Sequence, residues 1–302
     1  MFNNARMYRL GAPFGAGAAE LEAALQTRRF RPCGPVEVAT LGWSAPLGED
    51  TAALVHGVGG CLLLCLRKQE RLLPSAAVAE AVDERIMAIE AGESRDVSRT
   101  ERRALREQVT TEMLPRAFTS SRRTLLYIDT EAGWLVVDAA SAKQAEEAIT
   151  LLRQTLGSLP ATPPAPRIPP AGLLTAWLLE GNVPSDFVPT DACELRDDED
   201  GSVIRCKGRD LGSDEIHNHL RAGMQVVKLA LEWDERLSFV LADDLSIKNL
   251  RVGDALRDDL AEADDPAARL DAEFALLALQ LRELIARLDS LFGLTTEAAS
   301  GG

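Results

Sequence analysis

The sequence predicts an α+β fold, with antiparallel sheets covered by helices. Short apolar runs occur as neighbours joined by tight turns, for example RTLLYID (123–129) and GWLVVDA (133–139), which is typical of antiparallel strands. Helical patterns lie before and after such groups instead of alternating with single strands. A charged helical pattern also interrupts the first group, so we expect an inserted helical hairpin.

The composition is that of an ordinary globular protein with a strongly acidic balance. The chain has 302 residues, enough for two domains, and its formal net charge is −14. The start has no apolar signal segment, and no stretch approaches the roughly 18 uninterrupted apolar residues of a membrane span. We therefore expect a cytoplasmic protein with no membrane partner.

The cysteines and histidines form no recognisable metal site. Five cysteines without an export signal predict reduced thiols rather than a disulfide framework. Cys61 and Cys65 share one face of an apolar strand, but no second pair completes a zinc site. His217 and His219 form an HxH pair and His56 stands alone, so we expect structural roles. The sequence predicts neither a metal nor a cofactor.

The first elements are a short strand, RMYRL (6–10), and a helix over 18–28. Prolines and glycines then punctuate residues 28–50, which predicts a loop with one short strand. A buried strand follows over 60–74 and ends at Pro74. Together these elements predict part of a sheet with a helix on one face.

Residues 75–118 are typical of a helical hairpin. Ser75 can cap the first helix, which we expect to end at Gly92. Ser98 and Glu101 form the S-x-x-E pattern of a capping box for the second helix. The other faces are rich in charge, which predicts a solvent-exposed insertion. The apolar positions of both helices recur every three or four residues: Val78, Val82, Ile86, Ile89, Leu105, Val109 and Met113.

Two strands and a helix complete the central domain. The strands named above are joined by a turn near Thr130, and Ser141 caps the following helix, which ends at Gly157. We assign residues 1–74 and 119–157 to one central α+β domain. The inward positions of its last helix are Ala145, Ile149, Leu152 and Leu156.

A proline-rich segment separates this domain from the rest. Residues 158–170 contain six prolines, which excludes a helix or a central strand and predicts a stiff linker. The C-terminal domain, 171–302, is expected to start with a helix over 171–180 and to end with a leucine-rich helix opened by Asp265 and Pro266. Between them we expect an acidic loop (194–201), a strand (202–208), a helix (213–222) and an antiparallel meander (225–233, 236–243 and 245–252).

No motif predicts catalysis. The sequence has no GxxxxGK[ST] loop, no GxGxxG after a strand, no GxSxG elbow and no HExxH helix. Asp129, Glu131 and Asp138 lie close together on the central hairpin, a pattern compatible with the metal site of a nuclease. Turn and strand-end carboxylates that face water are the more common case, and we interpret Asp243 and Asp244 in the same way. We predict no catalytic residue and keep a metal-dependent nuclease as the alternative.

The basic positions are more informative in so acidic a chain. The run LPRAFTSSRR (114–123) has three arginines around one phenylalanine and no acid. Such cations can meet the phosphates of any DNA sequence, and an aromatic beside them can stack on a base or wedge at a step. The alternatives are solvated charges for the arginines and, for Phe118, an anchor in the core or in a subunit contact. The candidates for DNA contact are Arg116, Phe118, Arg122, Arg123, Lys207, Arg209 and Lys228.

Nine stretches distributed over nearly the full length carry a family resemblance: MYRL (7–10), FRPCG (30–34), LGWSAPLG (41–48), LPRAF (114–118), DAASAKQAE (138–146), LLRQTLGSLP (151–160), VIRCKGRDL (203–211), NHLRAG (218–223) and KLALEW (228–233). In this order they closely resemble the bacterial family of recombination-associated RdgC proteins.

The resemblance implies a ring-shaped homodimer, closed by two subunit contacts, whose positively charged hole encircles duplex DNA. Proteins of this family bind DNA without sequence preference, and single strands are a weaker expectation. They restrain strand exchange promoted by RecA because they occupy its DNA, and they are not enzymes. The basic groups of this chain would then line the hole, its acids would face outward, and the protein would be associated with the nucleoid.

Pro115 to Phe118 match the family segment in which an arginine and a phenylalanine are important for DNA binding. The resemblance implies that Arg116 reaches phosphate and that Phe118 lies at or near the contact that closes the ring. The hairpin 75–118 would be the tip or gate of the ring.

Two departures from the family pattern predict a thinner basic lining and weaker, salt-sensitive binding. Gly208 separates Lys207 from Arg209, and Met224 stands where a lysine is often expected. A third hypothesis, besides DNA binding and nuclease activity, is a regulator that meets the recombinase directly and has little affinity for naked DNA.

Overall fold

The structure is a computed structural model that describes residues 2–48, 51–254, 256 and 265–295. The described residues form helices and antiparallel sheets, so the α+β class is confirmed. None of the described helices is both long and apolar enough to cross a membrane.

The chain divides into two compact units. Unit 1 joins Met1–Leu25, Ala45–Cys65 and Thr124–Gly302, and unit 2 joins Gln26–Ser44 and Leu66–Arg123. The division therefore runs through two long strands instead of the expected boundaries at residues 75 and 118. The proline-rich segment lies inside unit 1 and does not separate the units.

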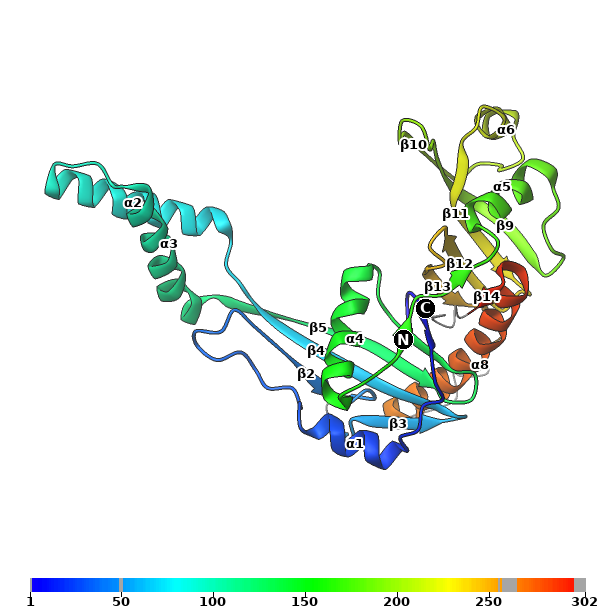
Figure 1. Cartoon of the computed structure of the whole chain (residues 1–302), viewed down its shortest axis with the longest axis horizontal. Helices are drawn as coiled ribbons and strands as arrows, with labels where there is room; N and C mark the ends of the chain where they lie inside the picture. The colour runs from blue at the N-terminus through cyan, green and yellow to red at the C-terminus, as the bar shows by residue number, and fades with distance from the viewer. Residues whose placement is uncertain (1, 49–50, 255, 257–264, 296–302) are drawn as a thin grey trace, which may run out of the picture. The chain divides into compact units, whose positions relative to one another are not determined.

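Seven strands form the first sheet. They are β1 (Arg6–Leu10), β2 (Ala39–Ser44), β3 (Val55–Val58), β4 (Cys61–Leu72), β5 (Phe118–Asp129), β6 (Trp134–Val137) and β7 (Ala161–Thr162). Their order is β2-β4-β5-β6-β1-β7, with β3 paired to β4. Figure 1 labels β2, β3, β4 and β5 of this sheet. The strand expected over 123–129 begins five residues earlier, so Phe118 is a strand residue and not part of the hairpin.

The second sheet belongs to unit 1 and is antiparallel throughout. Its strands are β9 (Phe187–Arg196), β10 (Val203–Lys207), β11 (Gln225–Trp233), β12 (Leu237–Ala242) and β13 (Ile247–Val252), in the order β10-β9-β11-β12-β13. The meander of the last three is confirmed. The expected acidic loop is wrong over 194–196, which belong to β9. That strand was missed because few of its side chains are apolar and buried.

The helices of unit 1 cover these sheets and are capped largely as predicted. Ser141 accepts from the Gln144 N–H, and Gly157 ends the helix with φ of 77°. Asp265 accepts from two N–H groups at the start of the last helix. The helices are α1 (Ala18–Gln26), α4 (Ala142–Leu156), α5 (Pro170–Glu180), α6 (Asp214–Arg221) and α8 (Pro266–Phe292).

The proline-rich segment is more than a linker. Within residues 158–170, strand β7 pairs with β1, and β8 (Ala165–Pro166) pairs with β14 (Leu294–Thr295). Both pairings are two residues long and β7 lies at a sheet edge. Short edge strands of this kind are compatible with proline, which lacks the N–H that a central strand must donate.

Between β4 and β5 lie α2 (Ser75–Glu93), α3 (Arg99–Met113) and the short 3-10 helix η1 (Leu114–Arg116). The capping box of Ser98 and Glu101 is confirmed. The predicted cap by Ser75 is wrong, because Pro74 occupies the N-cap with no side-chain hydrogen bond. The helix ends at Glu93, one residue later than predicted, and its C-cap Ser94 has φ of 49°. One glycine costs a helix only about 1 kcal/mol, so it does not by itself end the helix. The predicted apolar stripes meet in a small core of Val78, Val82, Ile86 and Val109.

A buried ion pair joins α8 to the central sheet inside unit 1. Arg282 Nε donates to Asp129 Oδ2 at 2.6 Å, and Nη1 donates to Glu131 Oε2 at 2.7 Å. The prediction that Asp129 faces water is wrong, because the residue is 2% exposed. Its other oxygen accepts from the N–H groups of residues 131 and 132. This cluster fixes the β5–β6 turn against the last helix.

We expect Arg282→Ala to lower the free energy of unfolding by about 3 kcal/mol, because removal of one partner leaves the Asp129 carboxylate buried and unpaired. Urea unfolding measures the change. The control is Arg269→Ala, on the same helix, whose exposed ion pair with Glu273 contributes at most about 0.5 kcal/mol. Equal effects of the two substitutions would contradict the structural role of Arg282.

Candidate nucleic-acid interface

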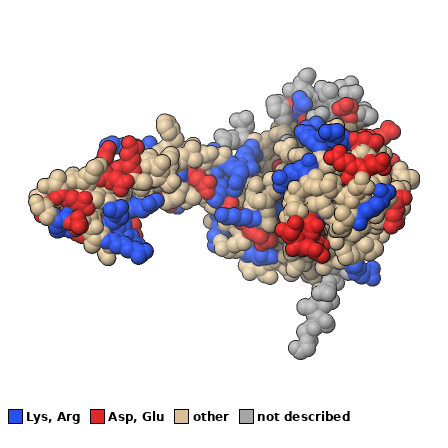
Figure 2. Space-filling model, turned by 90° about the horizontal axis from the view of Figure 1, so that it is seen from above, with Lys and Arg blue, Asp and Glu red and all other residues tan. Residues whose placement is uncertain are grey.

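Cations are concentrated in the strand portion of unit 2. We call residues 26–44, 66–74 and 114–123 the basic strand region; it contains nine Lys or Arg and two Asp or Glu, a net charge of +7 in a chain of −14. The hairpin residues 75–113 carry six bases and nine acids, a net charge of −3. Figure 2 shows clusters of Lys and Arg beside clusters of Asp and Glu on the face in view. The net charge of the whole chain therefore does not predict the net charge of its individual segments.

Both acids of the basic strand region already have cationic partners. Glu37 accepts two hydrogen bonds of 2.6 Å from the Arg31 guanidinium, which lowers the pKa of its carboxyl to about 2 with help from the Gly34 N–H. Glu70 lies 2.7 Å from the ammonium group of Lys68. Each acid of the region is thus paired with a cation, so the excess positive charge belongs to the other cations of the region.

The segment with Arg116 is held by an arginine that the sequence reasoning missed. Arg71 Nη1 donates to the carbonyl oxygens of Leu114 at 2.9 Å and Ala117 at 3.1 Å. Its Nε and Nη2 donate to the carbonyl of Gly34 at 3.2 and 3.0 Å. One planar guanidinium thus ties the turn after the hairpin to the loop before β2. Arg116 itself is exposed, and no described residue forms a hydrogen bond or ion pair with its side chain.

Phe118 is 84% exposed, so a place in the core of this chain is excluded. The contacts of Arg71 with Ala117 and of Gln69 with Ser121 show that β4 and β5 run antiparallel here. Leu72, which ends β4, is therefore at the same end of the ladder as Phe118 and is 54% exposed. Phe118 and Leu72 are thus two large exposed apolar side chains within the basic strand region.

Arg122 and Arg123 lie farther along β5, where every residue from 118 to 123 is exposed. Because side chains alternate across a strand, Arg122 shares a face with Phe118 and Arg123 lies on the other face with Ser121. Arg116, Phe118 and Arg122 are therefore exposed on the strand or its adjoining turn, and Arg123 places positive charge on the opposite face.

Lys207, Arg209 and Lys228 belong to unit 1. Lys207 is exposed at the end of the edge strand β10, and Arg209 is exposed in the turn after it. Lys228 is less available than expected: its Nζ donates to Glu194 Oε1 at 2.8 Å. Glu194 also accepts from Arg205 Nε at 2.8 Å, so one carboxylate lies between two cations in a single cross-strand row.

The Glu194 carboxyl is ionised by this arrangement. Its burial acts to raise the pKa, but the hydrogen bonds from Lys228 and Arg205 outweigh burial and hold the pKa below its ordinary value. Two cations on one carboxylate leave a net charge of +1 in the row. Arg205, which the sequence reasoning did not select, is 74% exposed at its side chain and is the outer member of this row.

The two departures from the family pattern have local structural reasons. Gly208 has φ of 67°, a left-handed conformation in which a side chain is strained. Its N–H donates to the Asp191 carbonyl, which turns the chain between Lys207 and Arg209. Met224 is buried in the core of unit 1, and its position would not tolerate an unpaired lysine charge.

The carboxylates of the nuclease alternative have structural partners. Asp129 binds Arg282, and Asp138 accepts from the N–H groups of Asn3 and Asn4 at 3.2 and 2.9 Å. Burial raises the pKa of Asp138. Across the described ranges, no three or more His, Cys, Asp or Glu side chains are grouped so that they could hold a metal ion.

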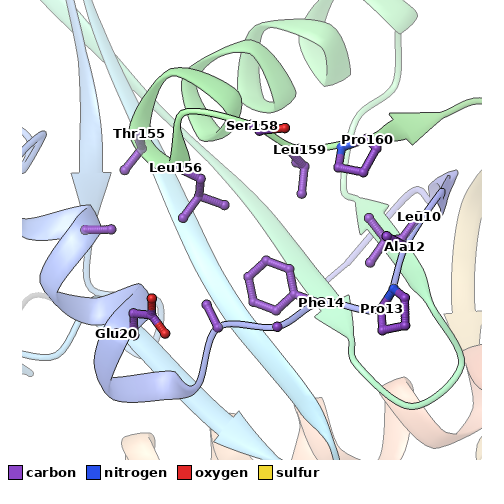
Figure 3. Close-up of a pocket in the computed structure, with 13 residues that line it drawn as sticks. Leu10, Ala12, Pro13, Phe14, Glu20, Thr155, Leu156, Ser158, Leu159 and Pro160 are labelled. Carbon is purple, nitrogen blue, oxygen red and sulfur yellow. The ribbon is translucent and has the colours of Figure 1, made fainter.

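A cavity of about 320 Å³ in unit 1 lies between the segment that leads into α1 and the end of α4. Figure 3 shows the Phe14 ring directed into it, with Glu20 on the α1 side. Its lining residues, all of them described, include this one carboxylate and no cation. Such a lining does not suit phosphate, so the cavity is not part of the candidate interface.

The sequence contained a signal that would have identified more of this surface. Net charge counted segment by segment separates the basic strand region from the acidic remainder without any structural information. The roles of Arg71 and Arg205 had no such signal, since each depends on a partner from a distant segment.

Comparisons with known proteins agree over almost the whole chain. The family model described as "Putative exonuclease, RdgC" matches residues 1–295. The recombination-associated protein RdgC of Aeromonas hydrophila is 43% identical over 295 residues, which cover 97% of each chain. The proteins of the same name from Tolumonas auensis and Psychromonas ingrahamii are 42% and 39% identical over 295 residues, covering 97% of this chain and 98% of theirs.

We expect Arg71→Ala to loosen residues 114–118, because three carbonyl oxygens lose a charged donor that contributes on the order of 1.5–3 kcal/mol. Hydrogen exchange followed by mass spectrometry should show exchange at least about tenfold faster in this segment. The control is Arg103→Ala, which removes an exposed arginine of α3 that pairs with Glu107, and it should leave the segment unchanged. Unchanged exchange in Arg71→Ala would contradict the positioning role.

Proposed function

The chain belongs to the RdgC family, and on that basis we propose that it binds DNA without sequence preference and restrains strand exchange promoted by a RecA-type recombinase. The relatives are named as recombination-associated proteins, which supports a role in recombination. In this proposal the protein acts by occupying DNA and not by cutting it.

The observation that carries the proposal is the basic strand region. Its net charge is +7, both of its acids are paired internally, and Arg116 and residues 118–123 are exposed. Phosphates are the part of DNA that every sequence shares, so cations presented in this way bind duplexes of any sequence. The region has no arrangement of amide side chains along an exposed helix that would favour reading base edges.

We further propose that the protein works as a homodimer that encloses duplex DNA. Phe118 and Leu72 are both large and exposed apolar side chains, and burial of either one against a second copy would supply energy to close the ring. Arg116 would then lie beside that contact and reach phosphate. Single strands would bind more weakly, and association with the nucleoid would follow from DNA binding.

Arg116→Ala should weaken duplex binding about equally on unrelated sequences and lower the salt slope by about one unit, because one phosphate contact is lost. Fluorescence anisotropy between about 50 and 200 mM salt measures both quantities. Arg103→Ala removes the same charge from the hairpin and should change the slope little. Effects that depend on DNA sequence would contradict the proposed mode of binding.

Phe118→Ala should reduce retention of DNA more than Arg116→Ala does, because it removes the apolar contact and not a single charge. Sedimentation of the free protein would show weaker self-association in the same variant. Phe118→Leu keeps much of the apolar area and should recover part of both properties. A Phe118→Ala variant that binds and associates like the parent would show that this residue has no role.

Glu194→Gln should increase affinity for duplex DNA and steepen the salt slope by up to about one unit, since Lys228 and Arg205 lose their shared counter-charge. The matched control is Glu199→Gln, which removes the same charge from the neighbouring loop, where no described Lys or Arg pairs with the Glu199 side chain. Equal responses of the two variants would exclude this cross-strand row from the interface.

A nuclease is the second candidate, because the matching family model is described as an exonuclease. We expect no nicking or shortening of plasmid and linear DNA with Mg²⁺ or Mn²⁺. The informative variant is Glu131→Gln, since Glu131 is 64% exposed at its side chain and its loss should leave the fold intact. Cleavage by the parent that disappears in this variant would establish the enzyme instead.

The third hypothesis, a regulator that contacts the recombinase and not DNA, predicts absent or salt-insensitive binding in the anisotropy experiment. Inhibition of strand exchange without measurable DNA affinity would favour it. Inhibition that disappears together with DNA binding in Arg116→Ala would support occupation of the DNA.

A further inference from the structure

Two cysteines of the second sheet face each other directly. Cys193 on β9 pairs with Cys206 on β10, between the neighbouring pairs Glu194–Arg205 and Ala192–Lys207. The two strands run antiparallel to each other, and β10 lies at one edge of the sheet. The two thiols therefore have neighbouring backbones and lie in one cross-strand row.

The thiols also lie on the same face of the sheet. Cys193 is 5% exposed within the core of unit 1, and Cys206 is partly buried against that core. Directly opposed residues of antiparallel strands have Cα atoms about 4.5–5.5 Å apart, within the roughly 4.4–6.8 Å found for disulfides. No change of strand register is needed to join the sulfur atoms.

The other cysteines lack this arrangement. Cys61 and Cys65 are four residues apart on β4, which separates their Cα atoms by about 13 Å. Cys33 has an exposure similar to that of Cys206, but its sulfur lies against the Thr40 hydroxyl and the Gln69 carbonyl oxygen. Cys33 is therefore a natural control for simple thiol oxidation.

We propose that Cys193 and Cys206 form a reversible cross-strand disulfide when the protein meets a hydroperoxide, so that this sheet edge is a redox-sensitive site. Its effect on DNA rests on the function proposed above, but formation of the bond does not. The expectation of reduced thiols from the odd cysteine count describes the resting state and is compatible with this reaction.

The reaction begins at Cys206, the more accessible sulfur. Its thiolate attacks one oxygen of the hydroperoxide, the O–O bond breaks, and the products are a sulfenic acid and an alcohol, or water if the oxidant is hydrogen peroxide. The Cys193 sulfur then attacks the sulfenic sulfur; its proton leaves with the departing hydroxide as water, and the S–S bond forms. Two thiols are oxidised and one peroxide is reduced. A dithiol reductant reverses the result by exchange.

Burial gives the two sulfurs different roles. It raises the pKa of the Cys193 thiol to about 12, with Cys206 as a further cause, so Cys193 stays protonated and does not meet peroxide first. It is instead placed to resolve the sulfenic acid on its neighbour before a second oxidation occurs. Irreversible oxidation of Cys206 is thereby avoided.

The bond would act on the cations of the proposed interface. Strand β10 has a partner on one side only, and it carries Arg205 and Lys207 on the outward face with Arg209 just beyond. A covalent tie at Cys206 restricts fraying of this edge. Cations held in place before binding lose less conformational entropy when they meet phosphate.

The test treats the full-length protein with hydrogen peroxide, blocks remaining thiols with N-ethylmaleimide and digests it without reduction for mass spectrometry. We expect a linked peptide containing Cys193 and Cys206, a free-thiol count lower by two, and full reversal by dithiothreitol. Cys33→Ser should retain the link, whereas Cys206→Ser should lose it. A folded protein that gives only sulfinic or sulfonic Cys206, or a link between other cysteines, would overturn the proposal.

Two further measurements separate this inference from the proposed function. Hydrogen exchange of residues 203–207 should slow on oxidation in the parent and not in Cys193→Ser/Cys206→Ser, whether or not the protein binds DNA. Oxidised parent protein should hold duplex DNA about twofold more tightly than reduced protein, by the entropy argument above. A link with unchanged affinity would contradict its effect on binding, while no affinity in either state would contradict the proposed function alone.

Discussion

The twelve-residue strands β4 and β5 are each buried in one half and exposed in the other, and the rest of the structure depends on this change in burial. The first six residues of β4 are buried and the last six are not, while the first six residues of β5 are exposed and five of its last six are buried. The backbone ladder is indifferent to side-chain polarity, so one strand pair can be apolar core at one end and exposed cationic surface at the other. Its exposed end gains little from burial and depends on hydrogen bonds such as those of Arg71.

The electrostatic field at a surface of this protein depends on the charges near that surface and not on the net charge of the chain. At physiological ionic strength the Debye length is about 8 Å, so acids on distant surfaces do not cancel the field of the basic strand region. The acids that could cancel it are its own, and Glu37 and Glu70 are already paired with cations. In unit 1, Glu194 offsets part of the positive charge of two cations at once, because it lies between Arg205 and Lys228.

Carboxylates with a spacing compatible with a metal site can instead form ion pairs and hydrogen bonds that stabilise the fold. Asp129 and Glu131 receive the guanidinium of Arg282 from the last helix, and Asp138 receives backbone N–H groups near the N-terminus. Each contact joins segments more than 130 residues apart. The carboxylates that raised the nuclease hypothesis are thus the ones that hold the ends of the chain to the central sheet.

Several parts of the fold followed from local sequence. The capping residues Ser98, Ser141 and Asp265 could be recognised because a helix start needs a side chain to satisfy its free N–H groups within three residues. The meander of β11 to β13 also followed from apolar runs and short turns. The end of α2 and the strand β9 did not, since glycine alone does not stop a helix and few of the β9 side chains are buried.

The sequence by itself determined the fold class, most helix ends, the family resemblance and the basic run around Phe118. Only the tertiary structure decided that Phe118 is exposed, that Arg71 holds the turn before it, that Glu194 neutralises part of the charge of Lys228, and that Cys193 faces Cys206. The physical reason is that capping, periodicity and composition act within a few residues. Strand register and burial instead depend on which distant segments pack together, and no local pattern encodes that choice.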